Sequence, residues 1–388
     1  MLRCGKNSAP TPRNTSGRTS RWTGSWSGNL SATARLSKGG GRSWRRDMLE
    51  RNNSPLVSVL MSVYNGERYV RFAIESILHQ TFTDFEFLII DDGSNDESVP
   101  LIQGFRDSRI RLVRNGRNLG LVASLNRGLE MARGAYVARM DADDISMPER
   151  LQRQVDFMDA NPEVDICGAW LEAFEGRDKS IWAPPLSDEE IKANLVFESV
   201  VYHPTVMMRH TVFSDLAARY DEDYPYAQDY ELWCRLSRSC RFANIGEVLL
   251  RYRLHERSVG RCKSDIQAML ACRVRKRLLS ELGIEPTELE LQLHGDISLW
   301  RIETDRRFLE RAHAWLLNLR RANAERGVIQ QQVFEKVLAR RWYEICFIAA
   351  PIGMDAMRCF YQSPLSEFLT VSLRHKLIFG ARALLGLR

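Results

Sequence analysis

Apolar residues follow a regular pattern from Leu56 onward, and the pattern alternates between two kinds of segment. Residues 56–63 form a near-continuous apolar run of strand length, whereas residues 67–80 repeat apolar residues at helical spacing. The same criteria predict further strands at 85–90, 110–113 and 136–140, and further helices at 119–132 and from 147 to about 160. Strands with so few polar residues are typical of a parallel sheet that is covered on both faces. The pattern therefore predicts a doubly wound α/β fold, whose ligands bind at the carboxyl ends of the strands.

The chain divides into three predicted parts. Residues 1–50 are rich in Ser, Gly, Arg and Thr and show no apolar periodicity, which predicts a disordered basic tail. Met48 stands just before the first folded segment, and we hypothesise that natural translation begins there. Residues 51–261 hold the predicted α/β domain. Residues 262–388 predict a separate α-helical region, because apolar residues recur three and four apart at 273–282, 299–320, 328–348 and 365–385.

Composition limits the class of protein. Of the 388 residues, 44% are hydrophobic and 27% are charged, which is typical of a globular protein. No run approaches the roughly 18 apolar residues that a spanning helix needs, so a transmembrane enzyme is not predicted. The eight cysteines form no C-x-x-C pair, so neither a disulfide scaffold nor a zinc ribbon is predicted. We expect a cytoplasmic protein.

The formal net charge of +6 is unevenly distributed along the chain. Counting Lys and Arg against Asp and Glu gives +8 for residues 1–50, −8 for residues 51–261 and +6 for residues 262–388. An acidic centre between basic ends predicts a core that binds a cation and flanks that meet an anionic surface. Clustered arginines without a reading module do not predict a nucleic-acid partner, and we expect none.

Polar clusters follow three of the predicted strands. The first strand runs into residues 62–67 (SVYNGE), the second ends in residues 91–94 (DDGS), and the fourth ends in residues 141–144 (DADD). Parallel strands bring these ends to one edge of the sheet, where the aspartates repel one another unless a cation lies among them. Two Asp separated by one residue suit a hard divalent cation. Taken alone, residues 141–144 fit a loop with a helix-capping Asp equally well.

Together with further motifs, these clusters resemble glycosyltransferase family 2, a family of inverting, nucleotide-sugar-dependent enzymes with the GT-A fold. The resemblance runs from about Pro55 to Gly260 and is carried by SVYNGE (62–67), QTF (80–82), DDGS (91–94), RNLG (117–120), MDADD (140–144), HPT (203–205), DYELW (229–233) and YRLH (252–255). The chain looks most similar to bacterial members that build surface polysaccharide or lipopolysaccharide. The resemblance implies a Rossmann-like mixed sheet flanked by helices, followed here by the helical region.

The resemblance assigns nucleotide-binding roles to residues at the strand ends. Ser62, Tyr64 and Asp92 match positions that hold the nucleotide. A carboxylate at Asp92 suits the N3–H of uracil, and Tyr64 can stack on the base. Asn65 and Glu67 match motif positions too, although a turn and the first turn of a helix explain them nearly as well.

Asp141 and Asp143 match the Asp-x-Asp motif of the family. In that motif the aspartates contact the ribose and a Mg²⁺ or Mn²⁺ ion that bridges the donor phosphates, and Asp143 is the predicted metal ligand. The cation neutralises charge on the leaving diphosphate. Two interpretations of Asp144 stay open, a part in this site and capping of the helix that begins near Pro148.

Asp229 matches the family's general base, the group that removes the proton of the acceptor hydroxyl. Family members commonly have Glu-Asp here, whereas this chain has Gln228-Asp229. The Gln removes a neighbouring negative charge, which lowers rather than raises the pKa of the base. Asp221, Glu222 and Asp223 are rivals, but their clustering is more typical of a solvated loop.

Three more residues have open roles. His255 belongs to a motif of the polysaccharide-building members, which implies a contact with phosphate or metal, and a structural role is the alternative. His203, beside Pro204, is more often structural. Trp233 could stack on an acceptor sugar, but the amphipathic helix around it favours core packing.

The predicted function is transfer of a sugar, with inversion, from a nucleotide-diphosphate sugar to a hydroxyl of a glycan or lipid-linked glycan. Uridine is the base that the resemblance favours. A non-catalytic nucleotide-sugar-binding module of the same fold is the alternative. An NAD-dependent oxidoreductase or P-loop enzyme is excluded, because no G-x-G-x-x-G follows the first strand and no G-x-x-x-x-G-K-[ST] occurs.

The end of the chain predicts a place in the cell. Residues 368–387 interleave Leu, Ile and Phe with Arg374, Lys376 and Arg382, as in a helix that lies on an anionic membrane surface. Packing against the catalytic domain or a partner subunit is an equal alternative. With a lipid-linked acceptor, we expect peripheral attachment to the inner face of the cytoplasmic membrane.

Overall fold

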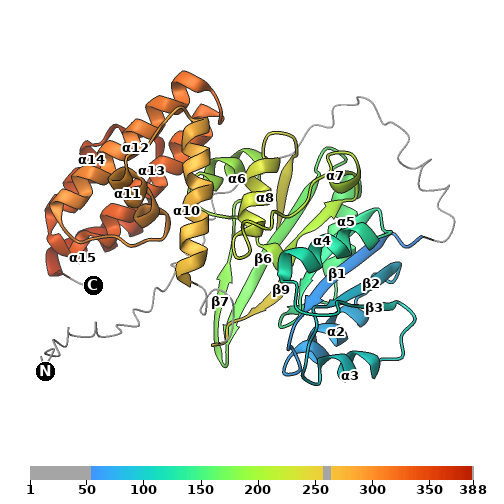
Figure 1. Ribbon diagram of the computed structural model, residues 1–388. Helices are drawn as coiled ribbons and strands as arrows, with labels where there is room; N and C mark the ends of the chain where they lie inside the picture. The colour runs from blue at the N-terminus through green and yellow to red at the C-terminus, as the bar shows by residue number, and fades with distance from the viewer. Residues whose placement is uncertain (1–53, 257–263, 387–388) are drawn as a thin grey trace, which may run out of the picture. The chain divides into compact units, whose positions relative to one another are not determined.

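The computed structural model describes residues 54–256 and 264–386. The predicted tail and the hypothesis about Met48 lie outside the described residues. Within them, every strand lies before residue 254 and only helices follow from residue 264 (Figure 1).

Nine strands of the described chain form one mixed sheet in the order β3-β2-β1-β4-β8-β6-β9-β5, with β7 paired to β6. β1 to β4 are parallel, β8 is antiparallel to β4 and β6, and β9 is parallel to β6. The expected parallel pairing therefore holds for β1 to β4 but not for the whole sheet. The strands are β1 Val57–Val63, β2 Phe85–Asp91, β3 Ile110–Arg114, β4 Tyr136–Asp141, β5 Ile145–Ser146, β6 Ile166–Glu175, β7 Asp178–Trp182, β8 Met207–Arg209 and β9 Phe242–Arg253.

Helices cover both faces of the sheet because its central strands are apolar on both sides. Leu60 of β1 lies in one buried cluster with Leu125 of α4. Its neighbours Val59 and Met61 point to the opposite face and lie in a second cluster with Ile74 of α2. The helices of this part are α2 Val70–Leu78, α3 Ser98–Gln103, α4 Leu121–Met131, α5 Arg150–Ala160, α6 Asp188–Leu195, α7 Thr211–Ser214 and α8 Gln228–Leu236, with a 3-10 turn at His203–Thr205. The expected α/β fold with flanking helices is confirmed.

Six helices lie within the described residues 264–386, and most buried residues of the last five form a third cluster around Trp315, Phe334 and Trp342. Local signals set their ends: Asp305 accepts a hydrogen bond from the Phe308 amide and starts α12, which ends at a left-handed Gly327 (φ 64°). The helices are α10 Ser264–Glu281, α11 Glu288–Ser298, α12 Arg306–Arg326, α13 Gln331–Ile348, α14 Met354–Gln362 and α15 Leu373–Leu385, with 3-10 turns at Ala350–Ile352 and Pro364–Phe368.

Three predicted helices of this region are wrong in extent, and two helices were not predicted. The helix expected at 273–282 is α10, which begins nine residues earlier, at Ser264. The helix expected at 299–320 starts only after the Asp305 cap. The helix expected at 365–385 is a 3-10 turn followed by α15, whose start is fixed by a hydrogen bond from the His375 amide to Ser372 Oγ. α11 and α14 are short, and their apolar residues did not stand out as a period.

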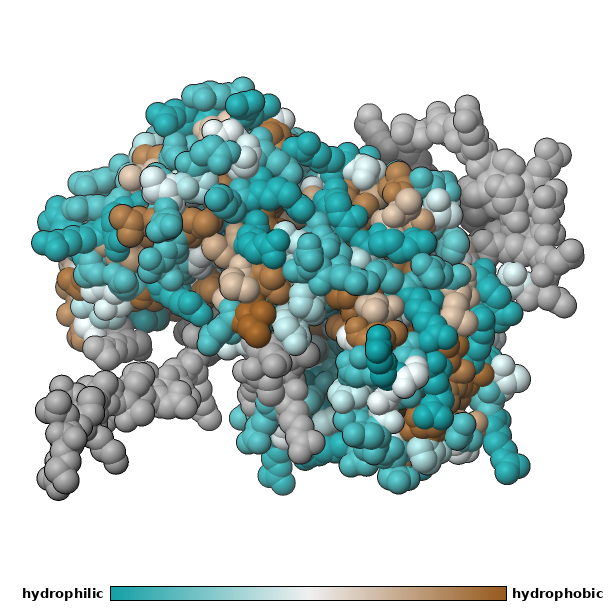
Figure 2. Space-filling model, viewed as in Figure 1, coloured by the Kyte–Doolittle hydropathy of each residue, from teal (hydrophilic) through white to brown (hydrophobic). Residues whose placement is uncertain are grey.

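No helix in the described part of the chain is both long and apolar enough to cross a bilayer. Figure 2 shows a mainly hydrophilic face, with apolar patches scattered among polar residues.

Candidate functional site

The polar segments after β1, β2 and β4 meet at one edge of the sheet, as the parallel register requires. Val63 of β1 pairs with Asp91 of β2, and Ser62 pairs with Asp141 of β4. The loops that follow these residues therefore leave the sheet at the same level.

Three carboxylates gather after β4. Asp141, Asp143 and Asp144 each offer an oxygen, and these oxygens lie within 4.8 Å of one another. Asp141 forms an ion pair with the buried guanidinium of Arg139. Asp144 is fully buried, and its Oδ1 accepts a hydrogen bond from the Arg253 amide (2.8 Å). The helix-capping alternative for Asp144 is wrong, because Glu149 occupies the N-cap of α5.

The electrostatics of this cluster favour a bound cation. Burial raises the pKa of the Asp144 carboxyl well above its usual value, and the charges of Asp143 and Asp141 raise it further. Burial likewise raises the pKa of Asp141, although the Arg139 charge acts against it. Among the described residues, Asp144 Oδ2 is buried without a hydrogen-bond partner. An unpartnered carboxylate oxygen beside two more carboxylates fits a hard divalent ion such as Mg²⁺ or Mn²⁺.

Two buried arginines underlie the acidic cluster, and sequence analysis missed both. Arg139 lies inside β4, and Arg150 in α5 donates from Nη2 to the Arg139 carbonyl (2.7 Å). Burial lowers the pKa of Arg150 to about 10, and the nearby Arg139 charge contributes. Charged residues inside otherwise apolar segments were the available signal. Their positive charge partly balances the aspartates.

His255 lies against the acidic cluster. Its Nε2 is 2.8 Å from Asp143 Oδ2, and its ring centroid is 5.1 Å from that of Tyr69. Arg253 stacks over Tyr69 and Phe174, with its Cζ 4.6 and 4.7 Å from the two ring centroids. These residues line a hollow of about 560 Å³. This placement brings His255 close to any ion or phosphate that Asp143 binds. Its role as a phosphate or metal contact stays a prediction.

The loop after β1 is tied to the loop after β2 by reciprocal hydrogen bonds. Asn65 has a left-handed backbone (φ 49°), and its Oδ1 accepts from the Asn95 amide (3.0 Å). Glu67 Oε2 accepts from the Glu97 amide (3.1 Å). Since α2 begins only at Val70, Glu67 is not in the first turn of that helix. Both side chains thus order the loop.

Ser62 and Tyr64 at the end of β1 differ in their exposure to solvent. Ser62 is partly buried at the end of β1, and the Tyr64 side chain is 50% exposed. An exposed ring at the carboxyl edge of the sheet is available for stacking on a base. Direct contact of either residue with a nucleotide stays a prediction.

Asp92 is buried and engaged by the loop before α4. Its Oδ1 accepts from Asn115 Nδ2 (2.7 Å) and from the Leu119 amide (2.9 Å), and its Oδ2 accepts from the Gly120 amide (2.9 Å). Asp92 therefore shapes the RNLG loop. Asn115, which also donates to Ser124 Oγ (2.9 Å), was not singled out in the sequence. The contact of Asp92 with a base stays a prediction.

Asp229 lies in the first turn of α8, at the positive end of the helix dipole. Burial raises the pKa of its carboxyl, whereas the Tyr230 amide and the Arg139 charge lower it. The charge of Asp141 also raises the pKa of this carboxyl. The adjacent Gln228 is buried, and its Oε1 has no hydrogen-bond partner within the described chain.

The other residues considered have structural surroundings. His203 is buried, its Nε2 is 2.8 Å from the Tyr220 hydroxyl, and burial lowers its pKa well below the usual value. Trp233 is fully buried and donates to the Val201 carbonyl (3.1 Å), so core packing is its role. Asp221 accepts from the Asp223 amide (2.9 Å) within its own loop.

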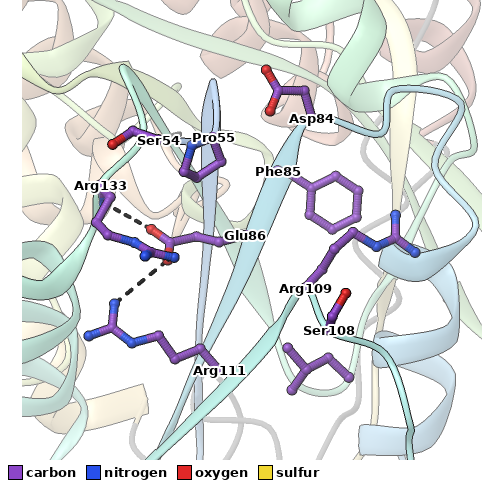
Figure 3. Close-up of a pocket in the computed structure, with 10 residues that line it drawn as sticks. Ser54, Pro55, Asp84, Phe85, Glu86, Ser108, Arg109, Arg111 and Arg133 are labelled. Carbon is purple, nitrogen blue, oxygen red and sulfur yellow. Dashed lines mark hydrogen bonds and ion pairs between the residues drawn. The ribbon is translucent and has the colours of Figure 1, made fainter. Parts of the chain in front are cut away.

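A second hollow, of about 510 Å³, lies at the amino ends of β2 and β3, away from this edge. Figure 3 shows Arg133 and Arg111 turned toward Glu86: Arg133 Nη2 is 2.7 Å from Glu86 Oε2, and Arg111 Nη1 is 3.6 Å from the same oxygen. Arg109 is paired with Asp107 (2.8 Å). With Asp84, which also lines the hollow, three carboxylates match the three arginines. The hollow has no excess charge and is not a candidate for the chemistry.

Comparisons with known proteins give a consistent result. The profile named Glycosyl transferase family 2 matches residues 58–216. An uncharacterized glycosyltransferase of Haemophilus influenzae is 33% identical over 249 residues, covering 60% of this chain and 77% of that protein. The amylovoran biosynthesis glycosyltransferase AmsE of Erwinia amylovora is 32% identical and covers 55% of this chain and 84% of its own. The O-antigen biosynthesis glycosyltransferase WbnJ of Escherichia coli is 30% identical, with 52% and 81% covered.

Solved structures agree on the fold. The crystal structure of S. aureus TarS 1-349 in complex with UDP-GlcNAc has a TM-score of 0.50 and 16% identity, and covers 79% of this chain and 91% of that one. At this identity the likeness concerns the fold alone. The family profile and the relatives, together with the acidic edge of the sheet, lead to one conclusion: the chain belongs to glycosyl transferase family 2.

Proposed function

We propose that this glycosyltransferase is metal-dependent and inverting, and that it transfers a sugar from a UDP-sugar to a hydroxyl of a glycan or lipid-linked glycan. The pathway that we propose is cell-surface polysaccharide biosynthesis. The observation that carries the proposal is the carboxylate cluster of Asp141, Asp143 and Asp144, with oxygens within 4.8 Å and one buried oxygen unpartnered.

The three aspartates have different proposed roles in binding the donor. Asp143 and Asp144 are the proposed ligands of Mg²⁺ or Mn²⁺, and Asp141, fixed by Arg139, faces the ribose. When bound, the cation supplies charge neutralisation for the leaving diphosphate. Tyr64 and Ser62 hold the nucleotide at the end of β1, and His255 reaches the phosphate side through its contact with Asp143.

Asp229 is the proposed general base. The acceptor hydroxyl oxygen forms its bond to the anomeric carbon as the bond from that carbon to the diphosphate oxygen breaks, and the hydroxyl proton passes to Asp229. This displacement inverts the anomeric centre. A pKa raised by burial suits a carboxylate that must accept a proton, which supports Asp229 as the base.

The relatives guide the choice of substrates. AmsE and WbnJ are named for amylovoran and O-antigen biosynthesis, which supports a surface-polysaccharide acceptor. The TarS structure contains UDP-GlcNAc, which makes UDP-GlcNAc the first donor to test.

A donor screen tests the proposal. Release of nucleotide diphosphate would be measured for UDP-, GDP- and dTDP-sugars, with Mn²⁺ or with EDTA, on wild type and Asp143→Ala. We expect Mn²⁺-dependent release from a UDP-sugar that Asp143→Ala abolishes. Asp178→Ala is the matched control, because Asp178 is an exposed aspartate in β7.

The screen also separates an enzyme from a binding module. If no donor is consumed but UDP binds with Mn²⁺, the chain is a non-catalytic nucleotide-sugar-binding protein. Release that persists in EDTA and in Asp143→Ala contradicts metal dependence.

We also propose peripheral attachment to the inner face of the cytoplasmic membrane through α15. Four leucines on this helix are each at least 65% exposed: Leu373, Leu377, Leu384 and Leu385. Phe379 points inward and is fully buried. Arg374 and Lys376 are exposed in the first turn and would meet anionic headgroups.

Flotation with anionic vesicles tests the attachment. A truncation before α15 would remove Phe379, which packs edge-on against Tyr343 (5.7 Å between ring centroids), so point variants are preferable. We expect Leu377→Gln combined with Leu384→Gln to lose vesicle binding, while Leu216→Gln, an exposed leucine next to α7, retains it. Equal flotation of all three proteins would refute the attachment.

A further inference from the structure

The first turn of α8, which carries Asp229, is not fixed by a capping side chain. The residue at its N-cap is Ala227, and no side-chain hydrogen bond caps the helix there. A general base needs a defined position, because a displacement of about 1 Å can cost about 100-fold in rate. Another part of the protein must therefore hold this turn.

α10 contacts the segment that leads into α8. Gln267 Nε2 donates to the Tyr226 carbonyl (3.0 Å), just before α8. The Arg273 guanidinium lies over the Tyr224 ring, 4.8 Å from its centroid. Both contacts fall on the segment that enters the helix, so α10 restrains the approach to Asp229.

Inside α8, an ion pair with α10 lies two residues beyond Asp229. Glu231 is 1% exposed, and its Oε1 accepts from Arg277 Nη1 (2.9 Å). Arg235, one turn further along α8, holds the other carboxylate oxygen (2.9 Å). Burial alone would raise the pKa of Glu231, but hydrogen bonds from Arg235 and Arg277 outweigh it and lower the pKa, so Glu231 is a buried anion. A buried anion that depends on two cations fixes the backbone around it.

α10 also joins the two hydrophobic cores. Ala271, Val274 and Leu278 belong to the same buried cluster as Leu232 and Trp233 of α8. By contrast, Leu279 and Leu282, at and beyond the end of α10, belong to the cluster of the C-terminal helices. α10 thus packs against the C-terminal helices near its end, while the face with Ala271, Val274 and Leu278 packs against α8.

We infer that α10 positions Asp229, and that Arg277 is a positioning residue for glycosyl transfer. The C-terminal helical region, through α10, then holds Asp229 in position. The inference rests on the proposed role of Asp229 as the base. It assigns no contact with substrate to Arg277.

Arg277→Met tests the inference because it keeps an unbranched apolar stem and removes the charged guanidinium that reaches Glu231. The control is Arg238→Met: Arg238 lies two residues beyond the end of α8, and its Nη2 pairs with Oε2 of Glu281, the last residue of α10 (3.0 Å). Arg277→Lys should restore the ion pair in part. Gln267→Ala weakens the same restraint with little loss of packing, and it serves if Arg277→Met fails to fold.

Hydrogen exchange gives a readout that needs no substrate. In Arg277→Met we expect the amides of residues 224–231 to exchange at least about tenfold faster, with exchange at residues 136–146 unchanged. Arg277→Lys should return exchange toward the wild-type rate, and Arg238→Met should leave residues 224–231 unaffected. Unchanged exchange at residues 224–231 in both Arg277→Met and Gln267→Ala would overturn the inference.

Turnover separates positioning from general loss of structure. With UDP-GlcNAc and Mn²⁺, we expect Arg277→Met to release UDP at least about tenfold more slowly, while calorimetry finds an unchanged affinity for UDP with Mn²⁺. A matching fall in UDP affinity would mean a structural role and would overturn the inference. Asp229→Asn is run alongside: if it retains wild-type turnover, the proposed base is wrong, and hydrogen exchange alone then decides whether α10 holds this turn.

Discussion

Replacing Asp144 by Asn changes the acidic cluster with almost no change of shape. The Asn oxygen can keep the hydrogen bond from the Arg253 amide (2.8 Å), and the new amide group takes the place of the unpartnered Oδ2. There it can donate to the neighbouring carboxylates of Asp141 and Asp143. The substitution therefore exchanges repulsion for hydrogen bonding. We expect opposite effects on the metal-free protein and on metal binding.

The size of the first effect follows from the geometry. The neighbouring oxygens lie within 4.8 Å, and at an effective dielectric constant of about 20 each ionised neighbour costs an ionised Asp144 about 3.5 kcal/mol. The buried Arg139 and Arg150 offset part of this cost. Protonation also limits it, because protonating an ordinary aspartate at neutral pH costs about 4 kcal/mol. We expect Asp144→Asn to stabilise the metal-free protein by about 1–3 kcal/mol, which raises Tm by roughly 3–8 °C.

The second effect has the opposite sign. A ligand present at about 100 times its Kd stabilises the folded state by about 2.7 kcal/mol, and a tenfold weaker Kd removes about 1.3 kcal/mol of that. Loss of one of three carboxylates should weaken Mn²⁺ binding at least about tenfold. The Mn²⁺-induced rise in Tm should therefore be smaller in Asp144→Asn than in wild type.

Thermal unfolding in EDTA and in Mn²⁺ measures both effects on the same samples. Asp178→Asn, which removes an exposed carboxylate of β7, controls for the change in net charge and should behave as wild type. An Asp144→Asn protein that melts below wild type in EDTA would refute the account of repulsion. An unchanged response to Mn²⁺ would refute the part of Asp144 in the metal site.

Two further predictions concern stability. Burial opposes ionisation of Glu86, but hydrogen bonds from Arg133 and Ser58 outweigh it and lower the pKa of Glu86 in the folded state below 4.5. This contribution is complete above pH 4.5 and is lost as the pH falls through the lower folded value, so in urea denaturation Glu86→Gln should lose stability at pH 7 and show a flatter acid limb. Gly134→Ala should cost more than about 3 kcal/mol because its Cβ would overlap the backbone at Ser58, whereas Gly295→Ala in α11, with nothing within 4 Å, should gain about 0.5–1 kcal/mol, both measured by the same method.

The apolar pattern predicts β1 to β4 well because a strand covered on both faces has few alternatives. It predicted none of the strands β5 to β9. The strand expected at 136–140 is observed at Tyr136–Asp141, and the one expected at 85–90 at Phe85–Asp91. The C-terminal helices were predicted less well, because their ends depend on caps such as Asp305 and Ser372 that are single residues in a polar background. The antiparallel pairing of β8 was not predictable, since a strand of three residues carries almost no periodic signal.

The motifs of the acidic edge were visible in the sequence, but their partners were not. Asp141, Asp143 and Asp229 stand out as carboxylates at predicted element ends. Asn115 and His255 act on Asp92 and Asp143 from distant segments, and single-sequence patterns contain no information on such pairs. Several motif residues also proved to hold the protein together: Gln80 donates to the Met147 carbonyl (2.7 Å) and so ties α2 to the loop that follows the aspartates.

Charged residues inside apolar strands need a physical explanation, and Glu86 and Arg139 have different ones. Glu86 in β2 is matched on every side by donors from Ser58 and Arg133, so it serves stability and needs nothing from outside the chain. Arg139 in β4 is buried with its Nε unpartnered within the described chain, and its charge acts on Asp141, Asp144 and Asp229 together. A buried charged group whose hydrogen-bonding atoms all have partners in the protein indicates a structural role. A buried charged group with unpartnered atoms beside other charges indicates a site that a ligand completes.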